Sequence, residues 1–211
     1  PVKQGIQSIT PEDLEFAASM GYRVKHLGIA RRQGDRVEMR VHPTLIPEEK
    51  QLANVDGVLN AVMIKGDAVG ELVLVGPGAG GAATASAVCA DLADIARTAA
   101  GSGPALGVPI AQLKSQALVP AEDIESEWYV RLAASDCAGV MSDITQVLAN
   151  HDVSIESLLQ NPPREDQTTV SIVLLTQVAS ASVMTAVMQE ITALTEVEKE
   201  FTLLRVEAFD Q

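Results

Sequence analysis

The chain has 211 residues, of which 47% are apolar, so it can bury the core of one large domain or of two small ones. Its formal net charge of −13 repels phosphate backbones and anionic lipid, which argues against nucleic acid and membrane surfaces as partners. The two cysteines, Cys89 and Cys137, predict neither a disulfide framework nor a metal site; without an apolar run of about 18 residues or a basic leader, the expected location is cytoplasmic.

The first predicted elements are a helix and two hairpins. Thr10-Pro-Glu-Asp13 has the hydroxyl cap, the early proline and the acidic residues of a helix start, and Gly21 is expected to end that helix. Alternating segments then flank two glycine-containing turns, which predicts four strands, expected at residues 23–30, 36–41, 57–64 and 70–75. We expect these strands to form one sheet, with two helices covering one face.

Basic side chains on these strands allow either a structural or a functional interpretation. Arg31, Arg32, Arg36 and Arg40 form the one basic cluster, and a solvated hairpin end is favoured over a phosphate site. His42 is expected at the edge of the sheet, where a single histidine is more often structural than catalytic.

A glycine-rich turn follows the second hairpin. Residues 71–75 predict a strand, Gly76-Pro-Gly-Ala-Gly80 a turn, and Thr84–Arg97 a helix. Glycines let a ligand approach the main chain, and free N–H groups at a helix start favour anionic or amide oxygens. The context does not match a complete Rossmann unit, because the helix runs into the glycine- and proline-rich segment 101–109.

The remaining chain predicts a second domain with the order βαββαβ, which is the ferredoxin-like layout. Its expected strands are residues 128–134, 153–160, 168–176 and 197–206, and its helices 140–150 and 180–194. The loop from Asp136 to Val140 joins its first strand to its first helix. Gly139 would admit a ligand to the main chain there; the alternative is that Asp136 only caps the helix.

Several motifs, taken in order and spacing, point to a known family. They are Gly5–Leu14, Arg40–Pro47, Asn60–Val62, Gly66–Gly70 and the glycine-rich turn at 76–80. With these motifs, residues 1 to about 100 resemble homoserine dehydrogenase, the NAD(P)-dependent enzyme that interconverts aspartate semialdehyde and homoserine. Residues 128–207 look like the ACT domain that follows the catalytic part in many bacterial members. Ala83 and Ala138 depart from the pattern, since proline is common at both positions.

The resemblance implies an α+β chain in which an antiparallel sheet with covering helices precedes a ferredoxin-like ACT domain. Residues 1–100 would be the carboxy-terminal part of the catalytic and dimerisation domain, 101–126 a linker, and 127–211 the ACT regulatory domain. The family's Rossmann domain, its catalytic lysine and its substrate-binding acidic residues would all precede Pro1. We therefore expect a carboxy-terminal fragment that holds no catalytic residue and is inactive by itself.

Binding sites are also implied by the resemblance. NADP or NAD would meet the main chain of Gly78, Ala79 and Gly80, although the fragment is not expected to bind the cofactor tightly. Threonine, or a related amino acid, would bind as effector to residues of the ACT loop and of a neighbouring strand, namely Asp136, Gly139, Val140 and Ser154. Residues 22–75 would pair two subunits in a homodimer or higher homo-oligomer. Two alternatives stay open: a non-catalytic amino-acid-binding module with a dimerisation domain, and a purely structural dimerisation piece.

Overall fold

The computed structural model describes residues 1–97, 112–160 and 169–209. These residues form two compact units, each with its own internal contacts. The first unit combines residues 1–48 with residues 117–211, and the second consists of residues 49–116. None of the helices within the described ranges is long and apolar enough to cross a membrane.

The first unit contains the predicted ferredoxin-like arrangement. Its elements in chain order are β7 (Glu125–Ser135), α3 (Val140–Asn150), β8 (Ile155–Gln160), β9 (Thr169–Ser180), α4 (Ala181–Ile191) and β10 (Val197–Val206). The strands lie in the order β10-β7-β9-β8, and each neighbouring pair is antiparallel. The fold class predicted from the sequence is therefore confirmed.

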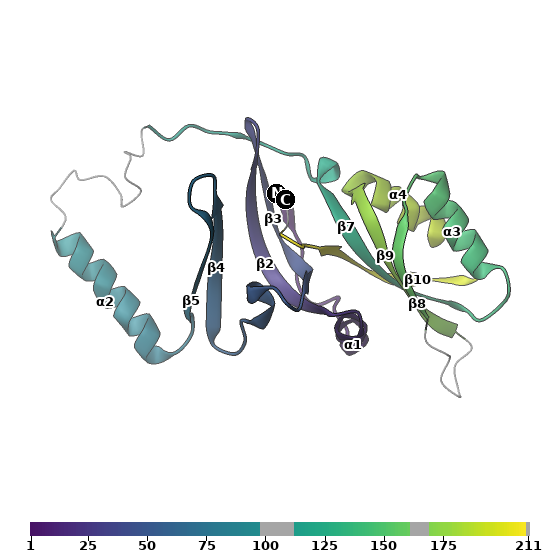
Figure 1. Cartoon of the computed structure of the whole chain (residues 1–211), viewed down its shortest axis with the longest axis horizontal. Helices are drawn as coiled ribbons and strands as arrows, with labels where there is room; N and C mark the ends of the chain where they lie inside the picture. Colours follow the sequence, from purple (N-terminus) through teal and green to yellow (C-terminus); the bar gives the residue numbers. More distant parts are fainter. Residues whose placement is uncertain (98–111, 161–168, 210–211) are drawn as a thin grey trace. The chain divides into compact units, whose positions relative to one another are not determined.

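Alternation along β7 divides its side chains between the two faces of the sheet. Trp128, Val130 and Leu132 pack with the apolar faces of α3 and α4, which both cover the same face (Figure 1). Ile144 of α3 and Met184 of α4 are fully buried there. These residues form the larger of the two apolar cores.

A third helix covers the opposite face of this sheet. The helix α1 (Pro11–Ser19) begins with the predicted cap, because the Thr10 hydroxyl accepts a hydrogen bond from the Asp13 main-chain N–H at 3.3 Å. Phe16 and Ala17 of α1 pack against residues that alternate with the first core, including Tyr129 and Val173. Residues from the beginning of the chain thus complete the core of the ferredoxin-like part.

The first hairpin also joins this sheet. Strands β2 (Tyr22–Gln33) and β3 (Arg36–Pro47) are antiparallel, and β3 continues the sheet by parallel pairing with β10. Two short strands, β1 (Val2–Lys3) and β6 (Ala117–Leu118), also pair with β3. Residues 117–126, within the range expected to be a linker, therefore pack on the first unit, with Val119 and Ile124 buried.

The second hairpin forms a separate two-stranded sheet, β4 (Leu59–Gly66) with β5 (Gly70–Pro77). The prediction of one four-stranded sheet is therefore wrong. Alternating apolar residues predict a strand and, with a turn, its hairpin partner, but they do not predict which strand pairs with the second edge. In the structure, the edge of β3 that does not pair with β2 pairs with β10. The short helix η1 (Gln51–Asn54) and the helix α2 (Gly81–Arg97) complete the second unit.

Candidate functional sites and family

The glycine-rich turn lies between β5 and α2. Gly78, Ala79 and Gly80 are all exposed, and Gly80 has a φ of +115°, which favours glycine. A Cβ at Gly78 would lie 1.3 Å from the Asn60 side-chain nitrogen, so any side chain there would displace Asn60. The Gly78 N–H donates to the Val58 carbonyl at 2.9 Å. The turn is thus fixed by backbone and asparagine contacts while its main chain stays open to a ligand.

The loop before α3 is also accessible. Gly139 is the N-cap residue, with φ 104° and ψ −30°, and no side chain within the described structure caps the helix. Asp136 is exposed. The interpretation of Asp136 as a helix cap is therefore wrong, and the first N–H groups of α3 have no side-chain acceptor. The Val140 side chain is 5% exposed and belongs to the core, so only its main chain can face a ligand.

Ser154, the fourth predicted effector-binding residue, makes no hydrogen bond to the loop before α3 within the described part of the chain. It is exposed and immediately precedes β8, and its carbonyl accepts a hydrogen bond from the Gln177 N–H at 2.9 Å. No hydrogen bond between Ser154 and Asp136 occurs in the described part of the chain. In the same ranges, no group of three or more histidine, cysteine, aspartate or glutamate residues could hold a metal ion.

Comparison with known proteins gives two family matches. The family described as homoserine dehydrogenase matches residues 2–93, and the family described as ACT domain matches residues 129–196. A homoserine dehydrogenase of Neisseria gonorrhoeae is 44% identical over 209 residues, which cover 97% of this chain and 48% of that protein. The chain belongs to the homoserine dehydrogenase family.

Other relatives agree. A homoserine dehydrogenase of Pseudomonas aeruginosa is 43% identical over 178 residues, which cover 82% of this chain and 41% of that protein. The crystal structure of a homoserine dehydrogenase from Thiobacillus denitrificans has a TM-score of 0.84 at 42% identity, with coverage of 97% of this chain and 47% of that one. The chain thus spans about half the length of the relatives that it matches.

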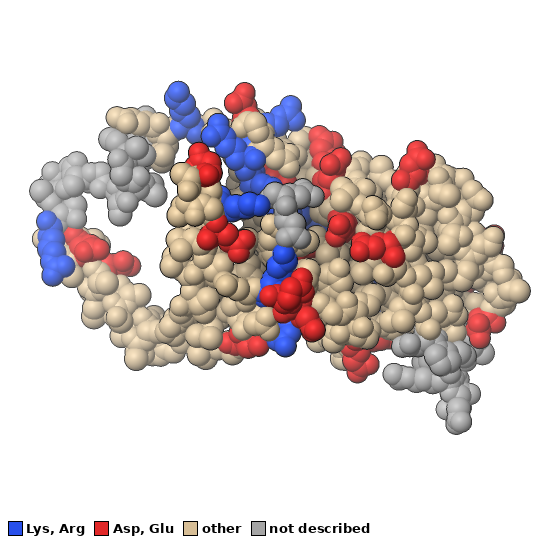
Figure 2. Space-filling view, in the orientation of Figure 1, with Lys and Arg blue, Asp and Glu red and all other residues tan. Residues whose placement is uncertain are grey.

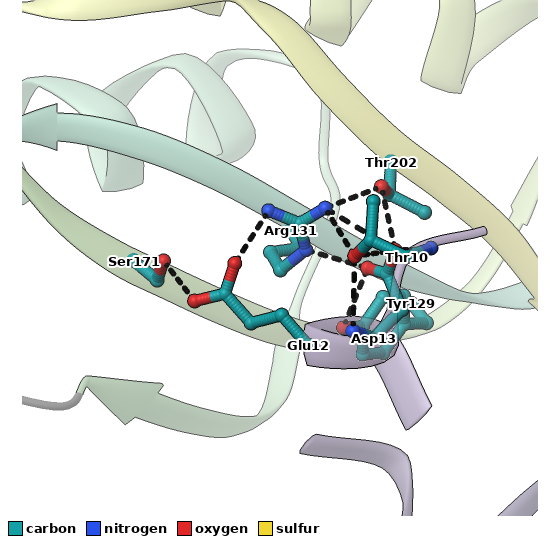
Figure 3. Close-up of polar contacts among 7 residues, drawn as sticks. All are labelled: Thr10, Glu12, Asp13, Tyr129, Arg131, Ser171 and Thr202. Carbon is teal, nitrogen blue, oxygen red and sulfur yellow. Dashed lines mark hydrogen bonds and ion pairs between the residues drawn. The ribbon is translucent and has the colours of Figure 1, made fainter. Parts of the chain in front are cut away.

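A buried polar cluster joins the homoserine dehydrogenase part to the ACT domain, and sequence reasoning missed it. Figure 3 shows Arg131 of β7 directed at the beginning of α1, where its Nε lies 2.5 Å from Asp13 Oδ1. Asp13 is fully buried and also accepts hydrogen bonds from the hydroxyls of Tyr129 and Thr202, each at 3.2 Å. Glu12 connects the cluster to Ser171 of β9 at 2.7 Å.

Electrostatics favour the charged form of both central groups. Burial alone would raise the pKa of Asp13, but hydrogen bonds from Arg131 and Thr10 outweigh it and lower that pKa below its usual value. Burial likewise opposes the charge on Arg131, yet its hydrogen bond and attraction to Asp13 raise the Arg131 pKa. The pair is therefore ionised at neutral pH and firmly connects α1 to the ACT sheet.

The basic cluster of β2 and β3 is not a solvated hairpin end as a whole. Arg32 and Arg36 are exposed, and Figure 2 shows Lys and Arg side chains gathered over the β2–β3 region. Arg40, by contrast, is 2% exposed and forms ion pairs with Glu38 at 2.7 Å and with Glu207 at 2.6 Å. Arg31 pairs with the same Glu207 at 2.8 Å. The solvated interpretation is therefore wrong for Arg40, while Arg31 remains a third exposed beside its carboxylate partner.

His42 is fully buried in β3, which has pairing partners at both of its edges, so its predicted place at the sheet edge is wrong. Its Nδ1 lies 2.9 Å from the Pro43 carbonyl oxygen, which accepts if Nδ1 carries the proton, while Nε2 has no partner among the described residues. Burial lowers its pKa to about 4 despite the Pro43 contact, and nearby arginines lower it further. His42 is therefore neutral at physiological pH.

Proposed function

We propose that the chain is the carboxy-terminal part of a homoserine dehydrogenase, which interconverts homoserine and aspartate semialdehyde with NAD or NADP. The observation that carries this proposal is the coverage: nearly the whole chain aligns with homoserine dehydrogenases twice its length. Reading the gene upstream of the Pro1 codon tests it. An in-frame Rossmann-coding segment, and a native protein of roughly twice 22.2 kDa, are expected. A stop codon directly upstream would contradict the proposal.

The cofactor contact is proposed at the main chain of Gly78, Ala79 and Gly80. Their exposure and the positive φ of Gly80 suit a ligand that approaches backbone closely. The bound cofactor supplies the carbon that carries the hydride. The contribution of this chain is orientation, since the turn is held by the Gly78–Val58 hydrogen bond and by the Asn60 side chain beside it.

The ACT domain is proposed to bind threonine or another aspartate-family amino acid. The uncapped N–H groups at the start of α3 suit a carboxylate, and the exposed Asp136 carboxylate suits an ammonium group. Gly139, with its positive φ, lets the main chain approach the ligand. Ser154 would contribute from a neighbouring subunit, so that binding and assembly are linked.

A homodimer is proposed through the antiparallel β4–β5 sheet. Register pairs Val62 with Leu74 and Ile64 with Leu72, so these four side chains share one face, and all four are 43–58% exposed. Val73 and Val75 belong to the other face by alternation. One contiguous apolar face of this kind is typical of an interaction site. The assembled enzyme is proposed to be cytoplasmic.

The second candidate function is an amino-acid-binding module without catalysis. It is favoured by the complete core of the ACT domain, in which α3, α4 and the sheet bury their apolar faces within this chain. The gene sequence upstream of the Pro1 codon distinguishes the two candidates. The enzyme requires a segment there that encodes a Rossmann domain, and the binding module does not.

A further inference from the structure

Arg205 of β10 is a buried cation without an anionic partner. It is 7% exposed, and its guanidinium carbon lies 4.4 Å from the centre of the Trp128 ring. Its Nε has no hydrogen-bond partner, and no carboxylate of the described chain pairs with it. The buried Arg40 differs, since it pairs with two glutamates, and so does the partly buried Arg131, which pairs with two acids. Buried charges are expensive unless paired, so an unpaired one requires an explanation.

The neighbouring acids are already occupied. Glu38 and Glu207 both bind Arg40, and Glu207 also binds Arg31. Glu38 also attracts Arg205 electrostatically, but its ion pair is with Arg40, so Arg205 has no carboxylate of its own in contact. Burial lowers the pKa of Arg205 to about 10, and repulsion by Arg40 contributes, but this value still leaves Arg205 charged at neutral pH.

Arg205 lines a cavity of about 310 Å³. Trp128, Phe201 and Leu203 supply apolar surface, while Gln4, Ser8 and Thr185 supply hydroxyl and amide groups. No Asp or Glu is among its lining residues. The cavity therefore offers a positive charge, apolar walls and neutral polar groups, which is the usual composition of a small-ligand site. It therefore offers a cation, and no anionic side chain, to a ligand.

We propose that this cavity binds a small organic monocarboxylate with an apolar body. The guanidinium of Arg205 binds the carboxylate, for which its planar, forked donors are suited, while Trp128 supports the guanidinium from one face. The apolar body lies against Leu203 and Phe201. This site is separate from the Asp136 loop, which follows Trp128 by eight residues of extended strand, or roughly 26 Å. The proposal does not depend on the threonine sensor.

Trp128 is the chain's only tryptophan, so all tryptophan emission comes from a side chain that lines this cavity and packs in the larger apolar core. The chain is titrated with sodium butyrate and, separately, with butyramide, at constant ionic strength maintained by sodium chloride. A saturable change in emission is expected with butyrate and none with butyramide, because only butyrate carries the charge. Equal responses to the two compounds, or no saturable response to butyrate, would overturn the proposal.

Variants of Arg205 separate a binding role from a structural one. Arg205→Met removes an unpaired charge, so without ligand its melting temperature is expected to rise above that of the parent chain, and its response to butyrate to be lost. A lower melting temperature together with an unchanged butyrate response would show that Arg205 is only structural. Arg205→Lys keeps the charge without the fork and is expected to bind butyrate at least threefold more weakly. If Arg205→Met does not fold, equal butyrate affinity of Arg205→Lys and the parent chain overturns the proposal. The exposed Arg36→Met is the matched control, with parental binding expected.

Discussion

The Arg131 guanidinium and the Asp13 carboxylate, 118 positions apart, form two contacts, Nε to Oδ1 at 2.5 Å and Nη2 to Oδ2 at 3.2 Å. This pair joins a helix of the homoserine dehydrogenase part to the first strand of the ACT domain. Arg131 also donates a hydrogen bond to the Thr10 hydroxyl at 3.2 Å, so β7 directly contacts the capped start of α1 (Figure 3).

Removing one partner of this pair is expected to destabilise the chain strongly. Asp13→Asn leaves Arg131 without its main anion and is predicted to lower the free energy of unfolding by about 3–5 kcal/mol. Urea denaturation followed by circular dichroism measures the change. Glu12→Gln is the matched control, since Glu12 has 40% side-chain exposure and its loss is expected to cost about 1 kcal/mol or less. Equal effects of both variants would contradict the central role of Asp13.

Acidification is expected to destabilise the fold through His42. Its folded pKa of about 4 lies below the ordinary 6.5, so the unfolded chain takes up the proton first as the pH falls. The stability that neutral His42 contributes is complete above pH 6.5 and is lost between pH 6.5 and 4, on the order of 3 kcal/mol. A His42→Gln variant should show a flatter stability profile across this range. The exposed His26→Gln control should retain the parental slope.

The chain alone is expected not to oxidise homoserine. The proposed cofactor contact consists only of main chain at one turn, and the family's catalytic lysine would lie before Pro1. Purified chain incubated with homoserine and either NAD or NADP should produce no increase in absorbance from reduced cofactor. Turnover that persists after repurification would contradict the fragment interpretation.

A homodimer is expected in solution, and Val62→Asp should convert it to a monomer. The substitution places a charge in the middle of the apolar face made by Val62, Ile64, Leu72 and Leu74. Multi-angle light scattering at micromolar concentration measures the mass. Val69→Asp is the control, because Val69 is 67% exposed but lies in the turn rather than on that face. A parent chain that is monomeric under these conditions would refute the proposed interface.

Threonine binding is expected to depend on the Asp136 charge. Asp136→Asn should weaken binding by about 1–3 kcal/mol, the range for a hydrogen bond to a charged group. Thermal stability of the free chain should be unchanged, because Asp136 does not cap α3. Calorimetry measures the affinity, and Asp143→Asn controls for general charge effects, because Asp143 is also exposed but lies in the first turn of α3 rather than in the loop before it. Equal affinity of the parent and Asp136→Asn would leave the sensor without support.

Local patterns predicted the elements of the fold well. The sequence placed α3 at 140–150 and β10 at 197–206, as the structure has them, because apolar periodicity and turn residues are local properties. The pairing of β3 with β10 joins residues about 160 positions apart, and no local pattern specifies such a partner.

The polar clusters were missed for a related reason. Arg131 and Arg205 alternate with apolar residues on their strands, and this alternation does not indicate what covers either side chain. The structure covers those faces with α1 and with the segment around Gln4, which turns both arginines inward. Both strands carry apolar residues on both faces, and an arginine in such a strand is the sequence signal that indicates a buried cation. Gly139 is enough to locate the Asp136 loop in the sequence. That no side chain caps α3 is visible only from the main-chain geometry of the described structure.

Because β3 pairs in parallel with β10, the ACT domain cannot be cut from this chain at its sequence boundary without exposing a strand edge. Cutting the chain at residue 127 would leave one edge of the ACT sheet with unpaired main-chain groups and would remove the α1 cover from Tyr129, Val173 and Leu175. An ACT domain transplanted from here into another protein would need residues 1–48 with it. The ACT domain of this chain therefore depends on residues 1–48 for the pairing of its edge and for the cover of one face, and the two parts can be replaced only as a pair.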